Sequence, residues 1–216
     1  MQKGQNVIRI LIADDHELIR AGLKTLLAHE SDLKVVAEAK NGHEVLEYVG
    51  KNTVDIILLD ISMPEKSGFD VLGDLKKRGS RVPVLMLTMH PEKRYAPRAF
   101  KSGAAGYVTK TSASTELVAA IRTIISGKRY ISPEYAEQVA HDFQNRLGGM
   151  LHEELSDREY QVFCLIASGD NIHDIAETLH IGEATVYTHR ERILEKMHMK
   201  SVAELARYAV EQGLIE

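Results

Sequence analysis

The sequence predicts an α/β domain with a five-stranded, doubly wound parallel sheet, followed by an all-helical domain. Over residues 1–127, five short apolar runs rich in branched side chains alternate with five segments of helical periodicity. Such alternation is typical of a parallel sheet covered by helices on both faces. From residue 154 onward every segment is helical in pattern, and two helices are joined by a three-residue turn. That second pattern predicts a helix-turn-helix.

The strands and helices of residues 1–127 are placed by their apolar patterns. Continuous apolar runs predict buried strands at Ile8–Ala13, Leu33–Ala39, Val54–Leu59, Val82–Thr88 and Ala104–Thr109. The first helix is expected to bury one stripe of residues, namely Leu18, Ile19, Leu23, Leu26 and Leu27. The second follows the turn signal Asn41-Gly42 and carries Val45, Leu46 and Val49. The other predicted helices are Gly68–Lys77, Arg94–Ser102 closed by Gly103, and Leu117–Ile125.

A linker is expected over residues 128–153, between the two domains. Ser132-Pro133 is a helix start, and the pattern from Tyr135 to Phe143 predicts a helix. Gly148-Gly149 is the candidate hinge.

Residues 154–216 predict four helices. Ser156 and Glu159 have the spacing of a capping box, and the helix that they open stops near Gly169. The next helices are expected at Asn171–Leu179, Glu183–Met197 and Ser201–Glu211. His180-Ile181-Gly182 forms the tight turn between the first two of these.

Composition narrows the class of protein. With 44% hydrophobic and 27% charged residues, the chain has the balance of an ordinary globular protein. It has no apolar run long enough to span a membrane and no signal peptide, so we expect a cytoplasmic protein without a membrane partner. The single cysteine, Cys164, lies in an apolar helical pattern and is expected to be a buried hydrophobe.

An acidic pocket is predicted at the carboxyl end of the sheet. Asp14 and Asp15 follow the first strand, and Asp60 follows the third, which Pro64 then prevents from continuing. Three like charges at neighbouring strand ends should bind a cation, and oxygen ligands without His or Cys suit Mg²⁺. Thr88 and Lys110 end the fourth strand and follow the fifth, where a hydroxyl and an ammonium would stabilise a phosphoryl group on Asp60.

Residues 8–127 resemble the receiver domain of bacterial two-component response regulators, which has a flavodoxin-like fold. The matching segments are Ile12-Ala-Asp-Asp-His16, Leu59-Asp-Ile-Ser-Met-Pro64 with Gly68, Leu87-Thr88 and Gly103-Ala-Ala-Gly-Tyr-Val-Thr-Lys110. The resemblance implies that Asp60 is phosphorylated by a partner histidine kinase. It implies that Asp15, Asp60 and the backbone carbonyl of Ser62 bind Mg²⁺ directly and that Asp14 binds it through water.

The same resemblance assigns a phosphate contact to Lys110 and a switch to Thr88 and Tyr107. Thr88 would turn toward the phosphate and Tyr107 would follow it. A half-buried edge aromatic is the alternative for Tyr107. His90, two residues after Thr88, is expected to be a solvent-exposed histidine, with a tuning role in phosphate lifetime as the alternative.

Residues 155–215 resemble the LuxR-type DNA-binding domain of NarL/FixJ response regulators. The matching segments are Leu155-Ser-Asp-Arg-Glu159, Ile175-Ala176, Ile181-Gly-Glu-Ala-Thr-Val186 and Thr188-His189. The resemblance implies that the helix from Glu183 to Met197 enters the major groove of double-stranded DNA. The candidate contacts are Thr185, Tyr187, Thr188, Arg190, Arg192 and Lys196. The last helix would form a homodimer interface through Val202, Leu205 and Ala209.

Charge opposes part of this second resemblance. From Leu151 to Glu216 there are 6 basic and 13 acidic residues, a net charge of −7, whereas DNA affinity comes largely from neutralised phosphates. Many relatives have Lys where this chain has Ala184 and Tyr187. Between Ala184 and Lys200, however, four basic residues stand against two acidic ones.

We therefore expect a two-component response regulator and not an enzyme. Phosphorylation of Asp60 would switch dimerisation and sequence-specific DNA binding, and thereby transcription. One alternative is a phosphorylation-dependent adaptor whose acidic helical domain binds protein and not DNA. Another is a phosphatase-like enzyme with an Asp nucleophile and Mg²⁺, for which the helix-turn-helix would have no use.

Overall fold

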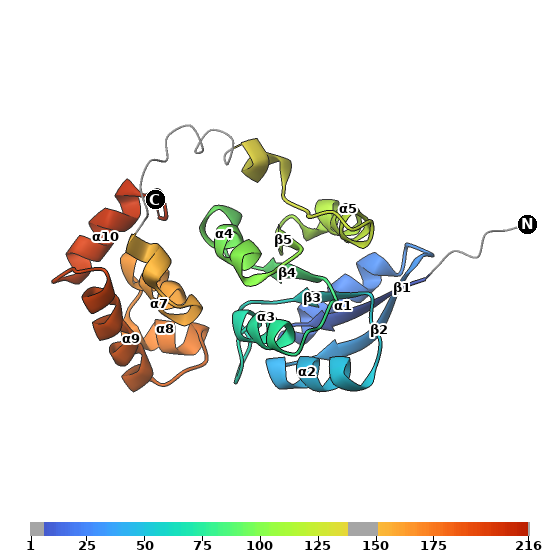
Figure 1. Ribbon diagram of the computed structural model, residues 1–216, viewed down its shortest axis with the longest axis horizontal. Coiled ribbons are helices and arrows are strands. Elements are labelled where there is room, and N and C mark those ends of the chain that lie inside the picture. The colour runs from blue at the N-terminus through green and yellow to red at the C-terminus, as the bar shows by residue number, and fades with distance from the viewer. Residues whose placement is uncertain (1–6, 138–150, 216) are drawn as a thin grey trace, which may run out of the picture. The chain divides into compact units, whose positions relative to one another are not determined.

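The computed structural model describes residues 7–137 and 151–215. The chain forms two compact units, Met1–Gln138 and Val139–Glu216, shown in Figure 1. Residues 133–137 of the predicted linker are helical. The rest of the helix predicted to end at Phe143, and the hinge predicted at Gly148-Gly149, lie outside the described residues. In the described part of the chain, no helix is long and apolar enough to cross a membrane.

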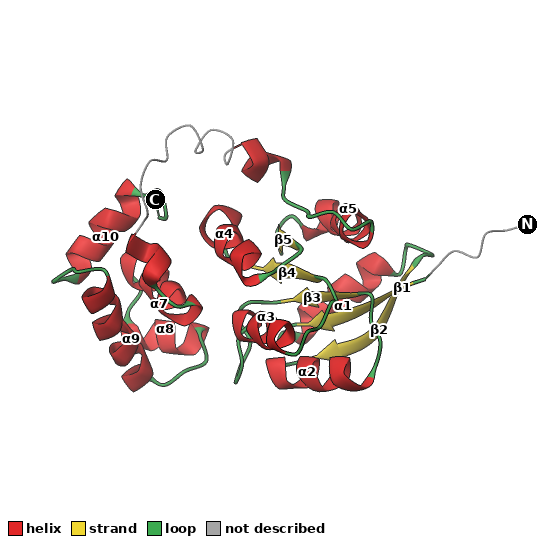
Figure 2. Ribbon diagram, viewed as in Figure 1, coloured by secondary structure: helices red, strands yellow, loops and turns green. Residues whose placement is uncertain are grey.

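The first unit is built on the predicted five-stranded parallel sheet. Its strands are β1 (Ile8–Ala13), β2 (Leu33–Ala39), β3 (Ile56–Leu59), β4 (Val84–Thr88) and β5 (Gly106–Thr109), in the order β2-β1-β3-β4-β5. Figure 2 shows these strands with helices on both sides. The fold class predicted from the sequence is confirmed.

Five helices cover the sheet. They are α1 (Glu17–Leu27), α2 (Gly42–Lys51), α3 (Gly68–Lys77), α4 (Glu92–Ser102) and α5 (Ala113–Ile125). One core cluster joins apolar residues of α1 and α5 to those of the strands, so these two helices share a face of the sheet. On α3, the apolar side chains Phe69, Val71, Leu72 and Leu75 are all buried.

Three strands begin two residues later than their apolar runs suggest. β3 begins at Ile56, and the side chain of the preceding Asp55 accepts from the backbone N–H and the guanidinium of Arg9 at 2.7–3.0 Å. β4 begins at Val84 and not at Val82, because Pro83 has no N–H to offer the ladder. Helix α4 begins at Glu92, earlier than predicted, and Gly103 closes it in a left-handed conformation as expected.

The buried stripe of α1 differs from the prediction. Leu18 is 83% exposed, and the inward position one turn before Leu23 belongs to Arg20. The Arg20 guanidinium donates to the backbone carbonyl of Asp14 at 2.8 Å and to Glu38 at 3.1 Å. Arg20 can therefore be buried because its charge and its donors are satisfied.

The second unit is helical. After a 3₁₀ turn, Leu151–Glu154, come α7 (Asp157–Ala167), α8 (Ile172–Thr178), α9 (Glu183–Lys196) and α10 (Val202–Glu211). The predicted capping box at Ser156 is present, and Cys164 is fully buried as expected. Helix α7 packs against both α9 and α10, and α8 packs against α9. The arrangement of α8 and α9 is the predicted helix-turn-helix.

Candidate functional site

Asp60 is the first residue after β3. The loop behind it is anchored by two buried side chains, Ile61 and Met63. It is closed by Gly68, whose N–H donates to the Ile61 carbonyl at 2.9 Å. A Cβ on Gly68 would lie 2.2 Å from the Asp60 carbonyl oxygen, so only glycine permits this approach. The position of Asp60 is therefore set by backbone packing.

Three charged side chains meet at this end of the sheet. β1 and β3 are neighbours, with Ala13 opposite Leu59, and this register places Asp14 beside Asp60. The Lys110 ammonium, just after β5, lies 2.6 Å from Asp60 Oδ2 and 2.7 Å from Asp14 Oδ2. The side chains of Lys110, Asp14 and Asp60 are only 6%, 2% and 3% exposed. The Asp60 carboxylate is therefore buried inside the pocket.

The pocket holds more negative than positive charge. Burial raises the pKa of the Asp60 carboxyl, with a further rise from Asp14, while the Lys110 ammonium and the Thr88 hydroxyl oppose this rise. Burial lowers the pKa of Lys110, but the two carboxylates outweigh burial and hold it above its ordinary value. One ammonium shared between two buried carboxylates leaves an acidic site that can bind a further cation.

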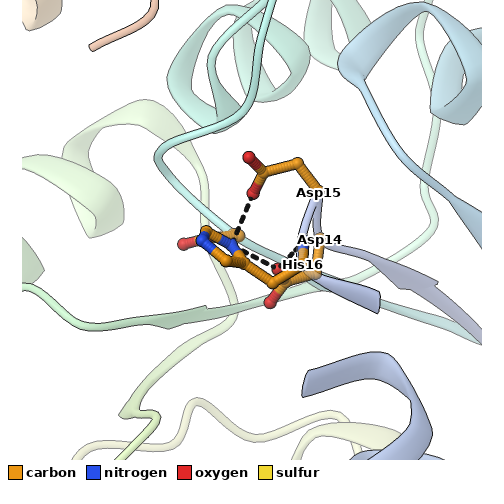
Figure 3. A group of neighbouring side chains, drawn as sticks. Asp14, Asp15 and His16 are labelled. Atoms are coloured by element: carbon orange, nitrogen blue, oxygen red, sulfur yellow. Dashed lines mark hydrogen bonds and ion pairs between the residues drawn. The ribbon is translucent and has the colours of Figure 1, made fainter. Parts of the chain in front are cut away.

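His16 belongs to the same pocket. Figure 3 shows its imidazole beside Asp14 and Asp15, with Nδ1 2.8 Å from Asp15 Oδ1 and 3.3 Å from Asp14 Oδ1. One donor atom each from Asp14, Asp15, His16 and Asp60 lies within 4.8 Å of the others. The ligands predicted from the sequence were all oxygen donors and did not include His16, although its place directly after Asp14-Asp15 was the available signal.

The predicted switch residues converge on His90. Thr88 is buried, and its hydroxyl oxygen accepts from the His90 N–H at 3.4 Å. Tyr107 is fully buried, not half-buried, and its hydroxyl donates to the His90 carbonyl at 3.0 Å. The His90 backbone therefore links Thr88 to Tyr107.

His90 itself is not the solvent-exposed histidine that was expected. Its ring stacks on Tyr95 with centroids 4.5 Å apart, and its Nε2 lies 3.0 Å from the Ser62 hydroxyl. Burial lowers the pKa of His90 to about 4, and the nearby cations Arg94 and Lys110 add to this effect. The β4–α4 loop thus turns this side chain back over the loop that follows Asp60.

The predicted DNA-contact residues all lie on α9, but they differ in exposure and in whether they form an ion pair. Thr185, Tyr187, Thr188 and Arg192 are exposed, whereas Arg190 is half-buried. The two arginines thus point in different directions, as their spacing predicts. The Lys196 ammonium lies 2.6 Å from Glu159 Oε2, with side chains 40% and 5% exposed respectively. Lys196 is therefore partly engaged in an ion pair inside the helical domain.

The predicted dimer residues need correction. Leu205 and Ala209 are fully buried, because α10 turns them toward α7 and the rest of this unit. Only Val202 of the three is partly exposed. The outward face of α10 instead carries Ala203, Arg207 and Val210. Helical periodicity identified an apolar face, but that face is the domain's own core.

A parallel α/β domain with a buried acidic pocket, joined to a helix-turn-helix domain, defines a class of signalling proteins that act on DNA. Comparison with known families agrees. Residues 10–122 match the response regulator receiver domain, and residues 153–209 match the bacterial regulatory proteins of the luxR family.

Two similar proteins align with nearly the whole of this chain, and a solved structure aligns with part of it. The response regulator UvrY of Escherichia coli K12 is 34% identical over 96% of both chains. The response regulator GacA of Pseudomonas viridiflava is 36% identical over 97% of this chain and 99% of its own. A solved LuxR-family response regulator from an Aurantimonas species is 34% identical, with a TM-score of 0.60 over 63% of this chain and 97% of that one.

The chain belongs to the NarL/FixJ family of two-component response regulators. It is a transcription regulator with a receiver domain and a LuxR-type DNA-binding domain. This membership favours DNA binding over the adaptor alternative, despite the net negative charge of the helical domain.

Proposed function

We propose that Asp60 accepts a phosphoryl group from a partner sensor histidine kinase. The observation that carries this proposal is the fixed carboxylate of Asp60 at the end of β3, with the Lys110 ammonium 2.6 Å away. In the transfer, a carboxylate oxygen attacks the phosphorus of phosphohistidine, the P–N bond breaks, and an acyl phosphate forms. Lys110 then offsets the charge of the phosphoryl oxygens.

Mg²⁺ is the cation that we propose for this pocket. Asp15, Asp60 and the backbone carbonyl of Ser62 would hold it directly, and Asp14 would hold it through water. The clustered carboxylates and the excess of buried negative charge support this fit. When bound, Mg²⁺ would neutralise carboxylate charge and polarise the phosphoryl oxygens.

The signal would leave the pocket through Thr88 and Tyr107. A phosphoryl group on Asp60 offers the Thr88 hydroxyl a stronger acceptor, and a shift of Thr88 would move the His90 backbone to which Tyr107 donates. Because His90 leads into α4, this linkage would change the outer surface at α4 and β5. We propose that this change favours a homodimer.

The output would be sequence-specific binding of the dimer to double-stranded DNA in the cytoplasm. Thr185, Tyr187, Thr188 and Arg192 are exposed on α9 and support a direct contact. Arg190 would have to extend from its half-buried position, and Lys196 would have to exchange Glu159 for a DNA phosphate. A second copy would dock on the outward face of α10, at Val210 and its neighbours, rather than on Leu205 and Ala209.

The variant Asp60→Asn tests both halves of the proposal. With a small acyl phosphate donor and Mg²⁺, the wild-type chain should take up phosphate, and Asp60→Asn should lose more than about 100-fold of this uptake because the nucleophile is gone. Asp74→Asn is the control, since Asp74 lies on α3 in ion pairs with Lys66 and Lys77. DNA crosslinked in cells to each chain would then be recovered and sequenced.

Discrete two-fold symmetric sites, weakened in Asp60→Asn and kept in Asp74→Asn, are the expected result. Phosphate uptake unchanged in Asp60→Asn would sink the assignment of the phosphoacceptor. Equal occupancy of the sites by both variants would remove the phosphorylation switch while keeping the DNA function.

A further inference from the structure

His16 stands out as a potential ligand that the proposed Mg²⁺ site does not use. It is the N-cap of α1, in an extended conformation, and its N–H donates to Asp14 Oδ1 at 2.9 Å. This bond fixes the backbone, and the ring lies against Asp14 and Asp15 with its Nδ1 toward both carboxylates (Figure 3). The side chain is 64% exposed, so it is held at the mouth of the pocket and not in the core.

The donor set of this pocket is mixed. Asp14, Asp15 and Asp60 each offer a carboxylate oxygen and His16 offers a ring nitrogen, all within 4.8 Å of one another. Two ligands on opposite sides of one ion at the usual distances of about 2.0–2.2 Å are about 4.4 Å apart, so a small inward shift of these side chains would bring all four donors onto one ion. Mg²⁺ favours oxygen and keeps much of its water, whereas imidazole nitrogen suits first-row transition metals, with affinity rising from Mn²⁺ to Co²⁺.

We propose that His16 makes this pocket a mixed nitrogen and oxygen site for first-row transition-metal cations. Such a cation would be bound by the carboxylates together with His16 Nδ1, whereas Mg²⁺ would be bound by oxygen ligands alone. The nitrogen-bound ion would use the imidazole tautomer with its proton on Nε2. Because Mg²⁺ and the transition-metal cation need the same carboxylates, they compete for one binding site. The inference rests on the proposed function only in that Asp60 and its neighbours form one cation site.

His43 offers a matched control. It is another receiver histidine with a similarly exposed side chain, 61%, and its Nε2 lies 3.9 Å from Glu65 Oε2. It is not part of the cluster of donor atoms around Asp60. A metal effect that depends on the pocket should therefore appear in His16→Ala and not in His43→Ala.

The experiment uses the full-length chain, freed of metal, and titrates Mg²⁺, Mn²⁺ and Co²⁺ separately by calorimetry. In wild type and His43→Ala, pulsed electron paramagnetic resonance of bound Mn²⁺ should show coupling to one imidazole nitrogen. In His16→Ala this coupling should vanish. The dissociation constant should rise about tenfold for Mn²⁺ and further for Co²⁺, but less than about twofold for Mg²⁺.

Three results would each overturn the inference. The first is the absence of nitrogen coupling in the wild type, and the second is its persistence in His16→Ala. The third is an equal loss of affinity for all three cations in His16→Ala, which would mean that His16 only supports the carboxylates. Phosphate uptake by the wild-type chain in Mg²⁺ tests the proposed function separately, so either proposal can fail alone.

Discussion

Each domain places a lysine ammonium 2.6 Å from a buried carboxylate, yet the two ion pairs differ in what surrounds them. In the receiver, Lys110 is shared between Asp60 and Asp14, and Asp15 lies in the same cluster. In the helical domain, Lys196 serves Glu159, whose carboxylate also accepts from the Ser156 N–H at 2.8 Å. In the first set one ammonium is shared between two buried carboxylates, whereas in the second set one ammonium pairs with one carboxylate.

The pKa values of the two carboxyls show this difference. Burial raises the pKa of Asp60, and Lys110 does not overcome it. Burial also acts to raise the pKa of Glu159, but hydrogen bonds from Lys196 and Ser156 outweigh it and leave the pKa below its ordinary value. The same residue types therefore form a binding site in one domain and a structural tie in the other, depending on whether partners balance the charge.

The largest expected effect is a loss of receiver stability on substitution of Gly68, which packs against the backbone of Asp60. Gly68→Ala would force a Cβ against the Asp60 carbonyl, 2.2 Å away, and should cost about 3 kcal/mol of unfolding free energy. Gly73→Ala, in the same helix with open space around its Cβ, should instead stabilise by about 0.5–1 kcal/mol. Urea unfolding of the full chain, followed by hydrogen exchange on receiver peptides, measures both. Equal effects of the two variants would show that the contact between Gly68 and the Asp60 carbonyl is loosely packed and can accommodate a Cβ.

The second prediction compares the two ion pairs directly, without divalent cation at pH 7. Glu159→Gln should destabilise the helical domain by about 2 kcal/mol, because it removes a charge-assisted bond to Lys196 from a satisfied set. Asp60→Asn should stabilise the receiver, because Lys110 would then face Asp14 alone. Hydrogen exchange resolved by domain gives both signs. Destabilisation by both variants would contradict the distinction between the two sets.

The smallest effect concerns pH and uses one carboxyl from each domain. Burial raises the pKa of Glu92 on α4, despite the bonds that Ser132 donates to it at 2.5 and 3.1 Å. Its folded pKa exceeds the ordinary 4.5, so its contribution to stability is present below that pH and is lost as pH rises through the folded pKa. For Glu159 the sign is opposite, with the contribution present above pH 4.5 and lost as pH falls through its lowered pKa.

Stability measured from pH 3.5 to 7 in wild type, Glu92→Gln and Glu159→Gln should therefore show two opposite differences. Glu92→Gln should remove a decline of receiver stability with rising pH, and Glu159→Gln should remove an increase in the helical domain. A pH dependence unchanged by either variant would show that neither carboxyl titrates differently on folding.

The order of strands and helices and the residues at the strand ends could be predicted from the amino-acid sequence alone. Asp14, Asp60 and Lys110 were predicted to meet although Lys110 is 50 residues from Asp60, because parallel strands bring their carboxyl ends to one edge. The capping box at Ser156 and the closure of α4 at Gly103 were equally predictable, since both depend on a few neighbouring residues.

The direction in which helices and loops turn their side chains depends on tertiary packing and could not be predicted from the sequence. An apolar stripe does not say whether Leu18 or Arg20 faces the sheet, or that Leu205 and Ala209 serve the domain's own core. Nor does it show that Lys196 reaches Glu159, because that depends on how α9 is rotated against α7. His16 and His90 join the pocket through the course of single loops. Periodicity is local, whereas the balance of buried charge depends on groups brought together by packing.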